Sequence, residues 1–184
     1  MQKNEWASWV QAIFSVIAIC AAVGIAMWQR RAEKAATVQR DLARAEIVAS
    51  KVLLMTSGLP VQLERLASHI RSVPEAADPM QLLETMQAQF DFMPMPDEGQ
   101  LMNLLPMPKK SARRLTHACE LVDQSKLSIR KLKQIGLVRN LREMPEQFSA
   151  LGDVVDRSVV LIEESRKDLD AFLHGRNAEV IAQS

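Results

Sequence analysis

An uncharged apolar run of 18 residues, 10–27, dominates the N-terminal part of the chain. A helix of that length covers roughly 27 Å at the usual rise per residue, close to the hydrocarbon thickness of a bilayer. Trp6 and Trp9 precede the run, Trp28 follows it, and these are the three tryptophans of the sequence. Indole rings favour the two boundaries between lipid and water, which a buried core helix does not require. The pattern predicts a transmembrane anchor over residues 1–31.

The charges that flank this run predict its orientation. Lys3 is offset by Glu5 before the run, whereas Arg30 and Arg31 follow it. Because cytoplasmic flanks of membrane helices carry the excess of Lys and Arg, we expect a single-pass inner-membrane protein with its N-terminus outside and its C-terminal bulk cytoplasmic. The reversed charge order disfavours a cleaved secretory signal. The predicted membrane-interface residues are Trp6, Trp9, Trp28, Arg30 and Arg31.

Residues 5–13 have the sequence EWASWVQAI and lead into an Ala- and Ile-rich run. This segment resembles the start of uncharacterised bacterial and prophage-type single-pass membrane proteins. The likeness covers only about the first thirty residues of the sequence. It implies an anchor and a bacterial origin, and it brings no activity and no functional residues to the rest of the chain.

Composition narrows the fold of the remaining chain to helices. Six Gly, no Tyr and 4% aromatic residues disfavour a β-sandwich or barrel, which needs turn glycines and strand-forming aromatics. With 24% charged and 48% apolar residues, the chain can bury a core, which excludes wholesale disorder. The predicted fold class is all-α, with the anchor continuing into a stalk helix and a helical bundle over residues 32–175. Residues 176–184 are expected to form a flexible tail.

The stalk is expected to continue the anchor helix over residues 5–56, until Ser57 and Gly58 end it ahead of Pro60. Small and apolar residues recur in it at spacings of three and four, which is typical of a coiled-coil seam. The seam residues are Ala35, Val38, Leu42, Ala45, Ala49 and Val52. Small residues also recur at every fourth position of the anchor. Together, these two patterns predict a homo-oligomer as one arrangement of the chain.

Two short amphipathic helices and a proline-rich connection are predicted next. The first covers residues 60–72, and the second starts at the N-cap Asp78 and continues to Phe90. Four prolines interrupt residues 91–108, with room for one or two helical turns over residues 97–104. The many apolar residues of this loop favour packing over the bundle, with a binding surface as the alternative.

The C-terminal part is predicted to be an antiparallel helical hairpin. Heptad patterns cover residues 111–136, with Gly136 as the expected cap, and residues 145–173, ahead of Gly175. Residues 109–142 contain ten basic and two acidic side chains, a net +8, whereas residues 143–184 contain four basic and nine acidic ones, a net −5. Opposite charge on neighbouring helices favours their pairing.

The basic side chains of this hairpin are the candidate binding surface. The residues are Lys109, Lys110, Arg113, Arg114, Arg130 and Lys131. Anionic lipid headgroups and an acidic partner protein are functional interpretations, and pairing with the acidic last helix is the structural alternative. The stretch contains no aromatic side chain for base stacking, which disfavours a nucleic-acid partner.

The sequence carries no pattern that predicts catalysis, a metal site or a cofactor. His69, His117 and His174 fall in three separate predicted helices, without carboxylates at triad or ligand spacing. Methionines of the proline-rich loop offer soft ligands for Cu(I), although methionine more often fills apolar gaps. Cys20 is expected in the membrane anchor and Cys119 in a helix of the bundle, so the two are not expected to form a disulfide. This fits a reducing compartment.

These observations predict a membrane-tethered helical interaction or scaffold protein rather than an enzyme. Its expected partners are the lipid bilayer and either another protein or further copies of the chain. The alternative is a prophage-type factor that alters the bilayer or excludes competing phage.

Overall fold

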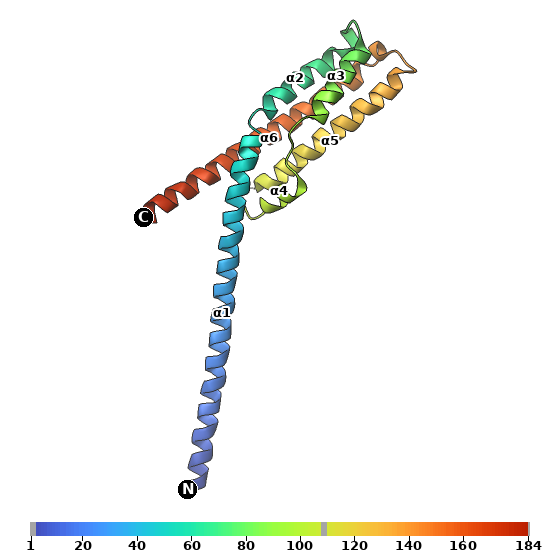
Figure 1. The fold of residues 1–184 in the computed structure, drawn as a ribbon. Coiled ribbons are helices and arrows are strands. Elements are labelled where there is room, and N and C mark those ends of the chain that lie inside the picture. The colour runs from blue at the N-terminus through green and yellow to red at the C-terminus, as the bar shows by residue number, and fades with distance from the viewer. Residues whose placement is uncertain (1–2, 108–109, 184) are drawn as a thin grey trace. The chain divides into compact units, whose positions relative to one another are not determined.

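The computed structural model of this chain describes the backbone of residues 3–107 and 110–183 and the side chains of residues 20–107 and 110–175. Every regular element in these residues is a helix, which confirms the predicted all-α class (Figure 1). Packing divides the chain into two units, Met1–Ala43 and Arg44–Ser184. The helices are α1 (Lys3–Met55), α2 (Leu59–Ser72), η1 (Val73–Glu75), α3 (Pro79–Asp91), α4 (Glu98–Asn103), α5 (Ser111–Gly136), η3 (Leu141–Glu143) and α6 (Pro145–Gln183).

Helix α1 covers residues 3–31 of the predicted anchor and continues without interruption through the predicted stalk to Met55. Among the described residues, no helix combines the length and the apolar character needed to cross a bilayer. Trp6, Trp9 and the first half of the predicted anchor lie outside the side chains that the structure describes. At the other end of the apolar run, Trp28 is exposed, as are Arg30 and Arg31.

Four helices of the second unit form an up-down-up-down bundle. Contacts join α2 to α6, α6 to α5, α5 to α3 and α3 to α2, so each helix packs against two others in a closed ring. Neighbouring helices in this ring are antiparallel (Figure 1). Short connections favour this between α2 and α3 and between α5 and α6, whereas the longer connection that contains α4 joins α3 to α5. Helices α5 and α6 therefore form the antiparallel hairpin that the heptad patterns predict.

One continuous core fills the centre of this bundle. The heptad positions that the sequence predicts are buried in α5, and most of those predicted in α6 are buried as well. The α5 residues are Leu115, Ala118, Val122, Ser125, Ile129 and Leu132, and the α6 residues are Phe148, Leu151, Val155, Ser158, Ile162 and Leu169. Spacings of three and four keep one face of each helix directed at its neighbours.

The proline-rich connection packs over the core, as the sequence favours. Met93, Leu104 and Met107 are buried in it. Within the connection, Asp97 caps α4 by accepting a hydrogen bond from the backbone N–H of Gln100, whose side chain in turn accepts one from the N–H of Asp97. This reciprocal pair satisfies two backbone donors and explains a helix of only six residues between prolines.

The predicted seam of the stalk is partly used inside the chain. Ala45, Ala49 and Val52 are fully buried in the core of the bundle. They are therefore not free to pair with a second copy, whereas Val38 stays exposed. A heptad pattern identifies an apolar face but not the surface that covers it.

Two expectations about helix ends are wrong. Helix α6 continues through Gly175 to Gln183, because a glycine inside a helix costs only about 1 kcal/mol and does not end it. The side chains of residues 176–184 lie outside the described part, so the flexibility of this tail stays a prediction. Helix α5 does end at Gly136, but no described glycine has a positive φ, so a left-handed cap is not the reason. A Cβ at Gly136 would lie 2.9 Å from Cδ1 of Leu141, so close packing requires the glycine.

Gly152 allows a charged side chain of α2 to cross α6. A Cβ at this position would lie 2.8 Å from Nε and 3.0 Å from Cγ of Arg71. The Arg71 guanidinium donates to Asp153 at 2.8 Å and to Asp156. These hydrogen bonds, to Asp156 first and then Asp153, raise the pKa of Arg71. The missing side chain at Gly152 therefore makes room for an ion pair that sets the register of α2 on α6.

We predict opposite effects for alanine at the two glycines of α6. Gly152→Ala gains helix propensity but forces a Cβ against Arg71, and the clash together with the weakened bonds to Asp153 and Asp156 should exceed that gain. The free energy of unfolding should therefore fall by about 1 kcal/mol. Gly175→Ala is the matched control, since nothing lies within 4 Å of its Cβ position. It should raise that free energy by about 0.5 kcal/mol through helix propensity. Urea unfolding in detergent micelles measures both values, and equal stabilisation by the two substitutions would contradict the crossing described here.

Candidate functional site

The predicted basic surface begins where α5 meets α6, and there it is partly neutralised. Nη1 of Arg114 donates to Oδ2 of Asp168 at 2.7 Å, and Nε lies 3.5 Å from Oε2 of Glu164. The Asp168 carboxylate is only 17% exposed, so this pair is less screened by solvent than a surface pair. Arg114 therefore serves the pairing of the two helices that the charge pattern predicts.

Other cations of α5 pair with α3, which the charge pattern did not predict. Arg130 lies 3.1 Å from Asp91, and Lys133 lies 2.9 Å from Glu84. The two acids are seven residues apart on α3, so they share one face of that helix. The spacing of the two acids in the sequence indicates an acidic face on α3. Only the packing of α3 on α5 shows that this face lies against Arg130 and Lys133.

After this internal pairing, three of the predicted basic residues remain available. Lys110, Arg113 and Lys131 are exposed, and none forms an ion pair within the described residues. Lys110 is also the N-cap of α5, with a left-handed φ of 60°. Lys109 lies outside the described residues. The three exposed cations thus do not gather at one place, because Lys110 and Arg113 lie at the start of α5 whereas Lys131 lies near its end.

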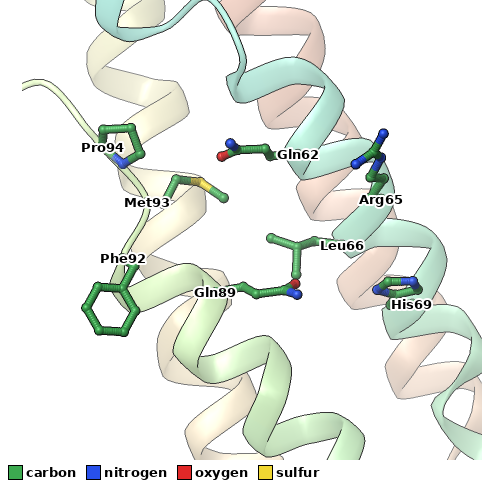
Figure 2. Close-up of a pocket in the computed structure, with 8 residues that line it drawn as sticks. All are labelled: Gln62, Arg65, Leu66, His69, Gln89, Phe92, Met93 and Pro94. Atoms are coloured by element: carbon green, nitrogen blue, oxygen red, sulfur yellow. The ribbon is translucent and has the colours of Figure 1, made fainter.

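A groove separates α2 from the end of α3. It has a volume of about 460 Å³, and its floor includes the buried side chains of Leu66 and Met93. Figure 2 shows Met93 and Gln89 directed toward α2, whereas Phe92, 89% exposed, turns away from the groove. The lining residues are Gln62, Arg65, Leu66, His69, Gln89, Phe92, Met93 and Pro94. An apolar floor with amide and cationic edges can receive a small apolar group, but its lining offers no carboxylate or thiol.

The histidines do not converge in the described structure. His69 lies on α2 at the groove described above, whereas His117 and His174 lie on α5 and α6. Nδ1 of His117 is 3.5 Å from Glu120 and Nδ1 of His174 is 3.5 Å from Asp170, each within one helix. Within the described residues, no three His, Cys, Asp or Glu side chains gather in a way that could hold a metal ion.

Three of the four loop methionines pack in or against the core, and Cys119 is partly buried. Met93 and Met107 are buried in the core, Met95 packs against it, and Met102 is exposed. Burial, followed by the charge of Asp123, raises the pKa of the Cys119 thiol to about 11. Such a thiol is protonated at neutral pH and is a poor nucleophile.

We predict that neighbouring arginines of α5 differ in their effect on stability. Arg114→Ala removes the hydrogen bond to Asp168 and the ion pair with Glu164 and should lower the free energy of unfolding by about 1 kcal/mol. Arg113→Ala, one residue away and exposed, should change it by less than about 0.5 kcal/mol. Urea unfolding of both variants tests this difference, and equal values would show that the clamp between α5 and α6 is not stabilising.

We also predict slow alkylation of Cys119. In a Cys20→Ser variant at pH 8, iodoacetamide should react roughly 10- to 100-fold more slowly with the folded chain than with the chain in urea, because the folded thiol is rarely ionised. The unfolded thiol, with its ordinary pKa of 9.0, releases its proton first, so the free energy of unfolding should fall between about pH 9 and 11. Mass spectrometry follows the reaction, and equal rates would contradict the burial of this thiol.

Comparison of this chain with protein-family models, with curated proteins and with solved structures finds no match.

Proposed function

We propose that this protein is a membrane-tethered interaction module, in which residues 10–27 anchor the chain and the helical bundle binds a partner. The observation that carries the proposal is the uncharged run with tryptophan at both ends, since its length suits a bilayer. Helix α1 supports it, because the run and the first buried residues of the bundle belong to the same unbroken helix.

Tethering alone gives such a module a physical effect. A binding surface held at a membrane meets its partner at a raised effective concentration, and this needs no catalytic side chain. The exposed cations Lys110 and Arg113 suit a place near the anionic cytoplasmic leaflet. The orientation follows from Arg30 and Arg31 after the run, which favour a cytoplasmic bundle.

We predict that the full-length chain pellets with membranes, resists alkaline carbonate and is released by detergent. An Ile17→Arg and Val23→Arg double variant should move to the soluble fraction, because each arginine in the apolar run costs about 3 kcal/mol on insertion. Val38→Arg is the matched control on the same helix, at an exposed position outside the run, and should still pellet. A wild-type chain that stays in the supernatant after high-speed centrifugation would contradict the proposed anchor.

Reporter fusions test the orientation of the chain, and assays of dye leakage and growth test the competing function. Green fluorescent protein at the C-terminus should fluoresce, and alkaline phosphatase there should be inactive. Active phosphatase would reverse the orientation. Dye leakage or growth arrest on expression would instead favour the prophage-type factor that acts on the bilayer.

A further inference from the structure

The turn between α5 and α6 exposes apolar side chains that the bundle does not use. Leu137 is 77% and Val138 is 87% exposed. Ile135 and Leu127, also exposed, precede them on α5, and Leu127, Lys131 and Ile135 follow one another at intervals of four residues on one face of that helix. An apolar strip therefore runs along α5 to the tip of the hairpin.

This strip borders two shallow grooves that meet at Lys131. The first, of about 400 Å³, is lined by Lys131, Gln134, Ile135, Val138 and Arg139. The second, of about 380 Å³, lies between α5 and α6 and is lined by Ser128, Lys131, Leu132, Gln147, Ala150, Leu151 and Val154. The two shallow grooves share Lys131 in their linings, and together we call them the hairpin groove.

The fold holds this surface in place. The N–H groups of Val138 and Arg139 donate to the carbonyl of Ile135 at 2.9 and 2.8 Å. Leu141 is buried against Gly136, and the next residue, Arg142, donates to the carbonyls of Ala76 and Ala77. The turn is thus attached to the bundle on both sides, and it directs Leu141 inward while leaving Leu137 and Val138 outside.

The charge of the hairpin groove selects among possible occupants. Lys131 and Arg139 line it, its lining contains no acidic residue, and neither cation forms an ion pair within the described residues. Two copies of the same face would bring these cations together, which disfavours a symmetric dimer here. A bilayer fits a convex apolar loop, whereas the side chains of a helix fit a concave groove between two helices.

We propose that the hairpin groove binds an acidic amphipathic helix of a partner protein, with apolar side chains against Ile135 and Val138 and carboxylates toward Lys131 and Arg139. This inference names the class of partner for the interaction module proposed above and rests on that function. It does not require the anchor, because every residue involved belongs to the bundle.

Photo-crosslinking in the native host tests it on the full chain. p-Benzoylphenylalanine at Ile135 or at Val138, which both line the groove, should give an adduct with the same protein, whose crosslinked peptide maps to an acidic amphipathic helix. The matched control is the same residue at Val160, which is exposed on α6 and outside the groove lining, and which should not give that adduct. Lys131→Glu with Arg139→Glu should lower the adduct yield about tenfold, while circular dichroism shows that the helices are retained.

Other results would overturn the inference. These are no adduct, an adduct at the mass of two chains, a lipid adduct, an adduct of equal yield at Val160, or a partner peptide that is basic. Membrane pelleting is measured in the same samples. A chain that pellets without an adduct refutes the groove alone, whereas a chain that stays soluble but forms the adduct refutes the anchor alone.

Discussion

The packing of α6 against both α2 and α5 is the interaction on which the bundle depends. Helices α2 and α3 contain 14 and 13 residues, lengths at which an isolated helix is marginal in water. They are helical because each buries an apolar face within a closed ring of four helices. Two charged side chains then fix how α6 lies in this ring, since Arg71 crosses it from α2 and Arg114 meets it from α5.

Serines of α5 and α6 are buried within the bundle. Ser125, Ser158 and Ser165 are buried, and each hydroxyl donates to a carbonyl of its own helix. Small side chains let two helices approach closely, but they bury less apolar surface than leucine. These serines therefore gain less from the hydrophobic effect than leucines would, and the pair of Arg114 with Asp168 adds a directional contact between α5 and α6.

The same distribution of charge links the fold to the proposed function. Helix α5 carries more cations than its neighbours neutralise, because α3 and α6 take up Arg114, Arg130 and Lys133 but leave Lys131 exposed. That remainder lies beside the apolar strip of the hairpin. A surface that is both apolar and cationic suits an acidic amphipathic partner, and a chain held at a membrane would meet such a partner more often.

The sequence by itself determined the helices, the buried stripes of α5 and α6 and the N-cap at Asp78, because spacings of three and four and capping residues act within one element. The proposed anchor rests on the sequence alone, through the uncharged run of residues 10–27. Only the tertiary structure decided that Ala45 and Ala49 face the core, that Arg130 meets Asp91, and that Leu137 stays outside while Leu141 turns inward. Each of these outcomes depends on which surfaces pack together from elements that are far apart in the chain. Local periodicity identifies an apolar face but does not show which distant element covers it.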